Sequence, residues 1–311
     1  MSIVSFDHQA ALQLEDGAAS LTLVPQFGGR LMRWDVAGQP VLHWPVAADW
    51  SRPGRIRGGN PLLFPFVGRH FVDGKPGSWR AADGNIYAMD THGFARNLPF
   101  TSELEEDGRA VRLILSDTPQ TRTEYPFSFQ FETLYRLDGA ALEVEFVTRN
   151  TGTAPLPYYP GHHFYFALPV EQRATTTLTL PPHRTQVQLP DGSLSATQAG
   201  APAYRLDDAA LIDRFHVLEA PGVARLSTTA LGAHPARTVT LAIDRPGSAP
   251  WYAVTTWTEQ PDSPFYCVEP WLGLPNAIHH GQGLRWLAAG QTEYAALRLT
   301  VEMRDSQHHQ S

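Results

Sequence analysis

Cysteine, lysine and long apolar runs are all scarce in this chain of 311 residues. Cys267 is the only cysteine, which excludes an intramolecular disulfide and any zinc site built from several cysteines. Lys75 is the only lysine, and it lies in the turn sequence Asp73-Gly74-Lys75-Pro76-Gly77. Schiff-base chemistry and a phosphate-loop lysine are therefore not expected. No run of about 18 apolar residues occurs, so we expect no membrane span.

Charged residues are few, and basic residues (24) are fewer than acidic ones (31). The formal net charge is −7, and charged residues make up 18% of the chain against roughly 25% in an average globular protein. Proteins that bind nucleic acid by neutralising phosphates are more often basic, so we expect no nucleic-acid partner. The first residues show no basic segment followed by an apolar one, so no secretory signal is expected. We expect a cytoplasmic protein that is a monomer or a homodimer.

Apolar residues and turn formers are abundant. Hydrophobic residues are 42% and aromatic residues 11% of the chain, enough for a sizeable core, which excludes global disorder. Glycine (25) and proline (26) together exceed the roughly 12% that they contribute on average. This excess favours many turns between short strands.

Apolar and polar residues alternate with a period of two wherever a period is visible, which indicates strands with one buried face. Four sets show it: Leu142, Val144 and Phe146; Leu297, Leu299, Val301 and Met303; Val239, Leu241 and Ile243; Val111, Leu113 and Leu115. Four further runs are rich in β-forming residues: Phe129–Leu137, Thr175–Leu180, Trp251–Trp257 and Phe265–Val268. Turn sequences such as Asp107-Gly108 and Asp138-Gly139 separate these runs.

Numerous short strands without alternating helices predict an all-β protein, a large antiparallel β-sandwich with few short helices. The best helix candidate, Ala209–Phe215, is two turns at most. We find neither a fixed repeat nor a linker that divides the chain. We therefore expect one domain over residues 1–304, followed by a polar C-terminal tail over 305–311 that frays.

Thirteen histidines raise the possibility of a metal site. A sandwich metal site would take three or four histidines and a carboxylate from neighbouring strands. Several histidines lie near other polar residues: His70, His92, His162, His163, His279 and His280. The acidic residue that could join them is Glu269. No His-x-His or His-x-x-x-His pair occurs on a recognisable element, and adjacent histidines on an extended chain point to opposite faces. We therefore expect no metal and no cofactor, with a metal-dependent sandwich enzyme as a lesser alternative.

Three segments combine polar and aromatic residues between turns. They are residues 58–69 with the later Thr91-His92-Gly93-Phe94, residues 159–166, and residues 266–276. Each contains groups that can transfer protons or bind hydroxyls, beside rings that could lie against a sugar. A histidine and a carboxylate with separated pKa values can act as an acid and base pair near neutral pH.

These segments resemble the galactose mutarotase (aldose 1-epimerase) family of large antiparallel β-sandwich proteins. The family's acid histidine lies in a Gly-x-His-x-Tyr-Phe motif, which His163 matches, and its base glutamate precedes a Pro-Trp or similar pair, which Glu269 matches. Its substrate-binding arginine and second histidine match Arg69 and His92. The resemblance runs from about Gly28 to Glu302, and the four motifs occur in the expected order.

The resemblance also implies a substrate-binding aspartate between the acid and the base. Asp213 is the best match, with Asp207 and Asp208 as rivals. Tyr165, Trp271 and Phe94 are candidates for stacking against a sugar ring. Phe164 stands where many members have proline.

By this resemblance we expect an aldose 1-epimerase that interconverts the α and β anomers of a free sugar without a cofactor. His163 would be the acid, as imidazolium, and Glu269 the base, as carboxylate. Two alternatives stay open. Arg57-Gly58-Gly59 is similar to the hexose-6-phosphate branch of the same superfamily, for which Arg52, Arg55, Arg57 and Arg96 could form a phosphate clamp. The other is a non-catalytic sugar-binding protein or sensor.

Overall fold

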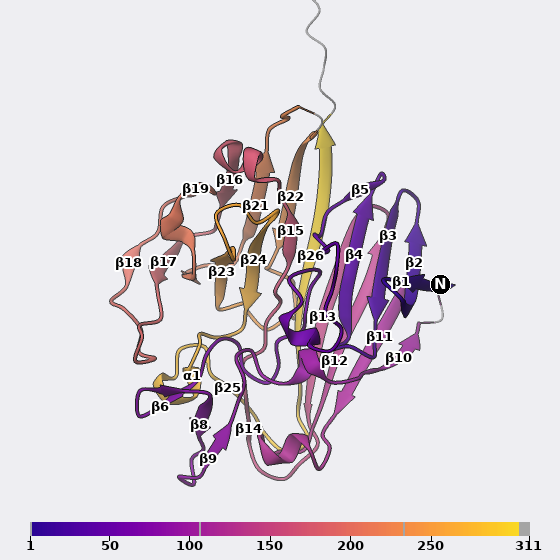
Figure 1. Ribbon diagram of the computed structural model, residues 1–311. Helices are drawn as coiled ribbons and strands as arrows, with labels where there is room; N and C mark the ends of the chain where they lie inside the picture. Colours follow the sequence, from indigo (N-terminus) through magenta and orange to yellow (C-terminus); the bar gives the residue numbers. More distant parts are fainter. Residues whose placement is uncertain (1, 106, 233, 305–311) are drawn as a thin grey trace, which may run out of the picture.

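The computed structural model describes residues 2–105, 107–232 and 234–304, so the expected tail 305–311 lies outside the described residues. Almost every regular element in this part of the chain is a β-strand, and the strands pair antiparallel throughout, which confirms the predicted all-β class (Figure 1). The one α-helix among the described residues is α1 (Ala277–His280). The 3-10 turns are η1 (Pro53–Arg55), η2 (Ala95–Asn97), η3 (Thr121–Thr123), η4 (Val170–Thr175) and η5 (Ala209–Leu211).

A nine-stranded sheet forms one layer, and its long strands carry the predicted alternation. In β13 and β26 the alternating apolar side chains are buried, apart from the half-buried Met303, while the intervening glutamates and arginines reach solvent in part. In sheet order the strands are β10 (Thr101–Leu104), β11 (Ala110–Ser116), β12 (Phe129–Asp138), β13 (Ala141–Asn150), β26 (Thr292–Arg304), β22 (Ala236–Ala242), β21 (Val223–Thr228), β16 (Thr176–Thr179) and β19 (Ala203–Arg205).

Two further sheets lie against this layer. The first comprises β1 (Ser2–Phe6), β2 (Gln9–Asp16), β3 (Ala19–Val24), β4 (Arg30–Val36) and β5 (Gln39–Pro40). The second comprises β15 (Tyr165–Ala167), β24 (Phe265–Trp271), β23 (Ala253–Trp257), β20 (Arg214–Leu218), β17 (His183–Gln186) and β18 (Gln198–Ala199). A bridge between Leu42 and Phe166 joins them. The result is the predicted sandwich, with β1–β5 over β10–β13 and the six-stranded sheet beside it (Figure 1).

Short hairpins occupy one end of the molecule, near α1 (Figure 1). The hairpins are β6 (Phe71–Val72) with β7 (Lys75–Pro76) and β8 (Ser78–Arg80) with β9 (Ile86–Ala88). Beside them β14 (Leu156–Tyr158) pairs with β25 (Arg285–Leu287), which lies far along the chain. Lys75 is exposed in the first hairpin, as its turn sequence predicts.

The core between the layers is rich in aromatic rings. Phe64 stacks on Phe131 with ring centroids 4.3 Å apart, and Phe66 stacks on Tyr159 at 4.6 Å. All four side chains are fully buried. Because each such ring contributes about 1.5–3 kcal/mol by leaving water, the segments 60–67 and 158–166 are fixed firmly in the interior. These segments lead directly into the residues of the candidate site.

All eight predicted strands are present. The best helix candidate, 209–215, is the single turn η5, within the two turns that the sequence allowed, and β20 follows it. Asp213, with a backbone φ of 55°, lies in the left-handed region and ends any helical path there. His279 and His280 lie in α1. No helix in the part of the chain that the structure describes is long and apolar enough to cross a membrane.

Candidate active site

A cleft of about 1010 Å³ opens over one face of the six-stranded sheet. Strands β20, β23 and β24 form its floor, and the loops around η1, η2 and Arg69 form its walls. Of the seven residues that the sequence predicted to form the site, the cleft brings six together: His163, Glu269, Arg69, His92, Asp213 and Trp271. They come from segments up to 202 residues apart in the chain, so only the fold brings them into one site.

The floor is built by cross-strand neighbours. Phe215 on β20 pairs with Thr255 on β23, and Thr255 pairs with Glu269 on β24. Directly opposed residues on adjacent strands share a face, so these three side chains lie side by side. Thr255 was not singled out from the sequence, although it alternates with the other residues of a predicted strand.

The two adjacent histidines face opposite ways, as predicted for an extended chain. His162 points into the core and stacks on Phe146, with centroids 4.0 Å apart. His163 points into the cleft and stacks almost parallel on Tyr165, with centroids 4.6 Å apart and planes at 5°. Alternation therefore decides which of the pair can meet a substrate.

Asn60 holds the backbone at this point. Its side chain is fully buried, and its Oδ1 accepts a hydrogen bond of 2.8 Å from the backbone N–H of His163. Its Nδ2 donates to the hydroxyl of Tyr135 at 3.1 Å and lies 3.0 Å from His162 Nδ1. Asn60 does not line the cleft, and it fixes the segment from behind. Sequence reasoning missed it, because a lone Gly-Asn-Pro turn gives no sign of these distant partners.

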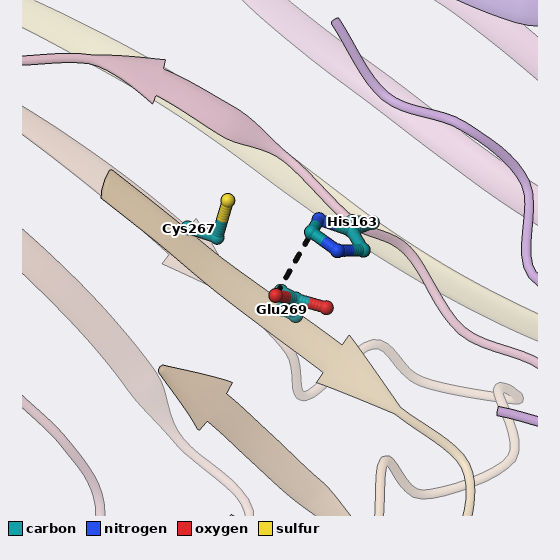
Figure 2. A group of neighbouring side chains, drawn as sticks. All are labelled: His163, Cys267 and Glu269. Carbon is teal, nitrogen blue, oxygen red and sulfur yellow. Dashed lines mark ion pairs between the residues drawn. The ribbon is translucent and has the colours of Figure 1, made fainter. Parts of the chain in front are cut away.

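His163 and Glu269 form a close pair on the cleft floor (Figure 2). His163 Nδ1 lies 3.4 Å from Glu269 Oε1, and the two residues are only 5% and 1% exposed. Among the residues that the structure describes, neither His163 Nδ1 nor Glu269 Oε2 has a hydrogen-bond partner. Buried polar atoms without partners are costly, and here they border a cleft that a substrate can enter.

Burial sets the charges of this pair. It raises the pKa of Glu269 well above its ordinary value, and the nearby carboxylate of Asp213 raises it further. It lowers the pKa of His163 well below its ordinary value, and the positive charges of Arg96, Arg57 and Arg30 add to this. Both shifts favour the uncharged forms, a protonated Glu269 beside a neutral His163, whereas the sequence suggested a carboxylate and an imidazolium. Both arrangements contain one proton, so they differ only in where it resides.

His92 and Asp213 flank the pair. The backbone N–H of Gly68 donates to His92 Nδ1 at 3.0 Å, so the neutral ring carries its proton on Nε2. The His92 ring meets those of His163 and Trp271 edge-on, at 5.4 and 5.8 Å. Asp213 stands exposed just before β20 and lines the cleft.

The other aspartates and Tyr165 are placed differently. Asp207 pairs with Arg205, and Asp208 accepts the backbone N–H of Ala210 at 2.9 Å, so neither faces the cleft. Tyr165 is 1% exposed behind the His163 ring and is not among the lining residues. Tyr165 thus contacts the cleft only through the His163 ring on which it stacks.

Arginines dominate the outer wall. Those that line the cleft are Arg52, Arg55, Arg57, Arg69 and Arg96. Arg57 lies over the ring of Trp257, 5.3 Å from its centroid, and pairs with Glu259 at 2.8 Å. Beneath them the fully buried Arg30 donates to the carbonyls of Pro53, Ile56 and Gly58, which fixes the loop that carries Arg55 and Arg57.

Comparisons with known proteins identify the family of the chain. The family profile described as Aldose 1-epimerase matches residues 10–292 of the chain. The chain therefore belongs to the aldose 1-epimerase family, as the sequence motifs predicted.

Relatives are distant in sequence. "Protein LacX, chromosomal" of Lactococcus lactis is 27% identical over 74% of this chain and 78% of its own length. The Escherichia coli protein named "Putative glucose-6-phosphate 1-epimerase" is 29% identical over 38% of this chain and 36% of its own length.

Solved structures share the fold. The Slr1438 protein of Synechocystis has a TM-score of 0.74 at 25% identity and covers 98% of this chain and 100% of its own. A galactose mutarotase related enzyme from Lactobacillus acidophilus has a TM-score of 0.76 at 22% identity, over 96% and 98% of the two chains. The second likeness shows the fold alone.

Proposed function

We propose that this protein is an aldose 1-epimerase that opens and recloses the ring of an aldose at C1. The observation that carries the proposal is the buried His163–Glu269 pair on the cleft floor, 3.4 Å apart. The C1 hydroxyl and the ring oxygen of an aldose are bonded to the same carbon. An acid and a base that serve these two oxygens must therefore lie close together, as this pair does.

The reaction needs one proton taken and one given. Glu269 as carboxylate removes the proton of the C1 hydroxyl, and His163 as imidazolium protonates the ring oxygen while the C1–O5 bond breaks. The open-chain aldehyde turns about C1–C2, and both protons return in the opposite sense. The productive charge state is reached by moving the shared proton from Glu269 to His163, so the pair gains and loses no proton overall.

The remaining cleft residues hold the sugar. Arg69, His92 Nε2 and Asp213 offer donors and an acceptor to the hydroxyls, and the indole of Trp271 offers an apolar surface. Holding C1 between the acid and the base replaces a random encounter in solution with a fixed geometry. This can lower the activation barrier by several kcal/mol. Mutarotation uses no oxidant or activated donor, so its proton balance is complete with these side chains.

A phosphorylated hexose is a second candidate substrate, because of the arginines on the outer wall. Guanidinium groups bind phosphate by paired hydrogen bonds, and Arg52, Arg55 and Arg69 are exposed in the cleft. The name of the Escherichia coli relative agrees with this substrate class. A strong preference for glucose 6-phosphate over glucose would select this candidate. A sugar-binding protein without turnover would not require an acid and a base, so the pair favours catalysis.

The test is polarimetry of freshly dissolved α-D-glucose and α-D-galactose, with anomer-resolved NMR of glucose 6-phosphate. Wild type is expected to accelerate at least one of them, and His163→Asn to lower turnover by about 10²–10⁴, the usual contribution of a positioned acid or base. His216→Asn is the matched control, because His216 is also a buried histidine but bonds Thr256 away from the cleft. Silence of the wild type on all three sugars would overturn the proposal.

A further inference from the structure

Cys267 is the side chain of the site that the proposed reaction does not use. It precedes Glu269 by two residues on β24, so the two side chains project from the same face of the strand toward His163 (Figure 2). Pairing of β24 with β15 and β23 sets Cys267 between Tyr165 and Trp257. Cys267 is a free, buried cysteine.

We infer that Cys267, His163 and Glu269 form a binding site for a thiophilic divalent cation such as Zn²⁺. One ligand atom from each residue lies within 4.8 Å of the other two, the only such group of three among the residues that the structure describes. Thiolate, imidazole and carboxylate are the donors that Zn²⁺ takes in proteins.

The distances fit a tetrahedral ion after a small adjustment. Bonds of about 2.0–2.3 Å to Zn²⁺ place neighbouring ligand atoms roughly 3.3–3.6 Å apart. The separation of 3.4 Å between His163 Nδ1 and Glu269 Oε1 already has this value. Cys267 Sγ lies within 4.8 Å of the other two ligand atoms, so it has to approach them by about 1.2 Å at most.

Unused polar atoms point to the same place. His163 Nδ1 and Glu269 Oε2 are buried without hydrogen-bond partners, and both residues border the cleft, which gives an ion its entry path. The cleft leaves the fourth position open for water or a sugar hydroxyl, so the site is of the open kind.

Charge balance supports a dication with these ligands. A thiolate and a carboxylate together cancel the two charges of Zn²⁺, so binding adds no net charge beside Arg30, Arg57 and Arg96. The ion displaces the thiol proton and the Glu269 proton into solvent, and nothing is oxidised or reduced. Since it occupies both proton-transfer groups, Zn²⁺ acts as an inhibitor. This inhibitory consequence depends on the proposed function, while metal binding itself does not.

The experiment titrates Cd²⁺ into the full chain and follows the ultraviolet thiolate-to-cadmium charge-transfer band. Because Cys267 is the only cysteine, a band that saturates at one Cd²⁺ per chain reports this site alone. Cys267→Ala should abolish the band. By calorimetry it should also weaken Zn²⁺ binding at this site at least about 100-fold, since changes even outside the ligand shell cost 10–100-fold.

Glu269→Gln keeps the thiol and should weaken Cd²⁺ binding while the protein stays folded, so it tests the site if Cys267→Ala fails to fold. Polarimetry completes the set: Zn²⁺ should inhibit wild type, and Cys267→Ala should resist it while retaining turnover. Absence of a thiolate band, or an unchanged band in Glu269→Gln, overturns the metal site even if the enzyme is active. A clear band in a protein that accelerates no sugar would overturn the proposed function and leave the metal site standing.

Discussion

Replacing Asn60 by alanine tests how the fold holds His163 in place. The Asn60 side chain is buried and serves three groups: the backbone N–H of His163, the hydroxyl of Tyr135 and the ring of His162. Each buried group left without a partner costs about 1–3 kcal/mol. Allowing for partial relaxation, we expect Asn60→Ala to lower the free energy of unfolding by about 3–5 kcal/mol. Urea unfolding measures this loss.

The same substitution should lower catalysis, because the freed backbone lets the His163 ring shift against Glu269. A displacement of about 1 Å costs roughly 10²-fold in rate, and it should appear in kcat more than in KM because Asn60 does not line the cleft. Asn150→Ala is the matched control. Asn150 is equally buried and bonds Ala154, Leu287 and Gly152, away from the cleft.

Both variants should therefore lose similar stability, while only Asn60→Ala loses turnover. Mutarotation is measured on protein shown to be folded by circular dichroism, at a temperature well below both unfolding midpoints. If Asn60→Ala lowers kcat no more than Asn150→Ala does, the positioning role of Asn60 is refuted and its contribution is to stability only.

Three further predictions concern the His163–Glu269 pair, the buried His216 and the close backbone contact at Gly93. The raised pKa of Glu269 predicts that turnover falls at alkaline pH, where Glu269 loses its proton. The lowered pKa of His163 predicts that turnover falls at acidic pH, where His163 gains a proton. A pH–rate profile without an alkaline fall would contradict this. Burial lowers the pKa of His216 to about 3, so this histidine stabilises the fold above pH 6.5 and loses that contribution as pH falls toward 3. The drop in unfolding free energy from pH 7 to pH 5 should therefore be about 2 kcal/mol smaller in His216→Gln than in wild type. Equal drops in the two proteins would refute the assignment. Gly93→Ala should lower the free energy of unfolding by about 2–4 kcal/mol, because φ is +71° and the added Cβ would lie 2.2 Å from a backbone carbonyl oxygen. The control Gly84→Ala, with φ +89° and open space around the added Cβ, should lower it by about 1–2 kcal/mol. Equal losses of thermal stability in the two variants would show that the close contact at Gly93 is relieved.

Local patterns were enough to predict the strands. The alternation in β13 and β26 is visible because one face of each strand is buried, and the turn residues between strands mark their ends. Alternation gives the buried face of a strand and says nothing about its neighbours. That β26 pairs with β13 on one side and β22 on the other, across more than 140 and 50 residues, could not be predicted.

The candidate site divides in the same way. His163 and Glu269 stand in motifs with recognisable neighbours, so the resemblance located both. Asn60 and Arg30 act through backbone groups far along the chain, and no local pattern reveals such partners. The protonation of His163 and Glu269 could not be predicted from the sequence either. Their pKa shifts come from burial, and at His163 also from arginines that only the fold brings near.

The most direct test of the account is the exchange rate between α and β anomers at equilibrium, measured by NMR for wild type and Glu269→Gln on the sugar that wild type accelerates best. Glu132→Gln is the control, because Glu132 is buried in its pair with Arg112 on the nine-stranded sheet. We predict exchange that is fast in wild type and in Glu132→Gln, and slower by about 10²–10⁴ in Glu269→Gln. Exchange at the wild-type rate in folded Glu269→Gln would contradict the assignment of the base and with it the proposed mechanism.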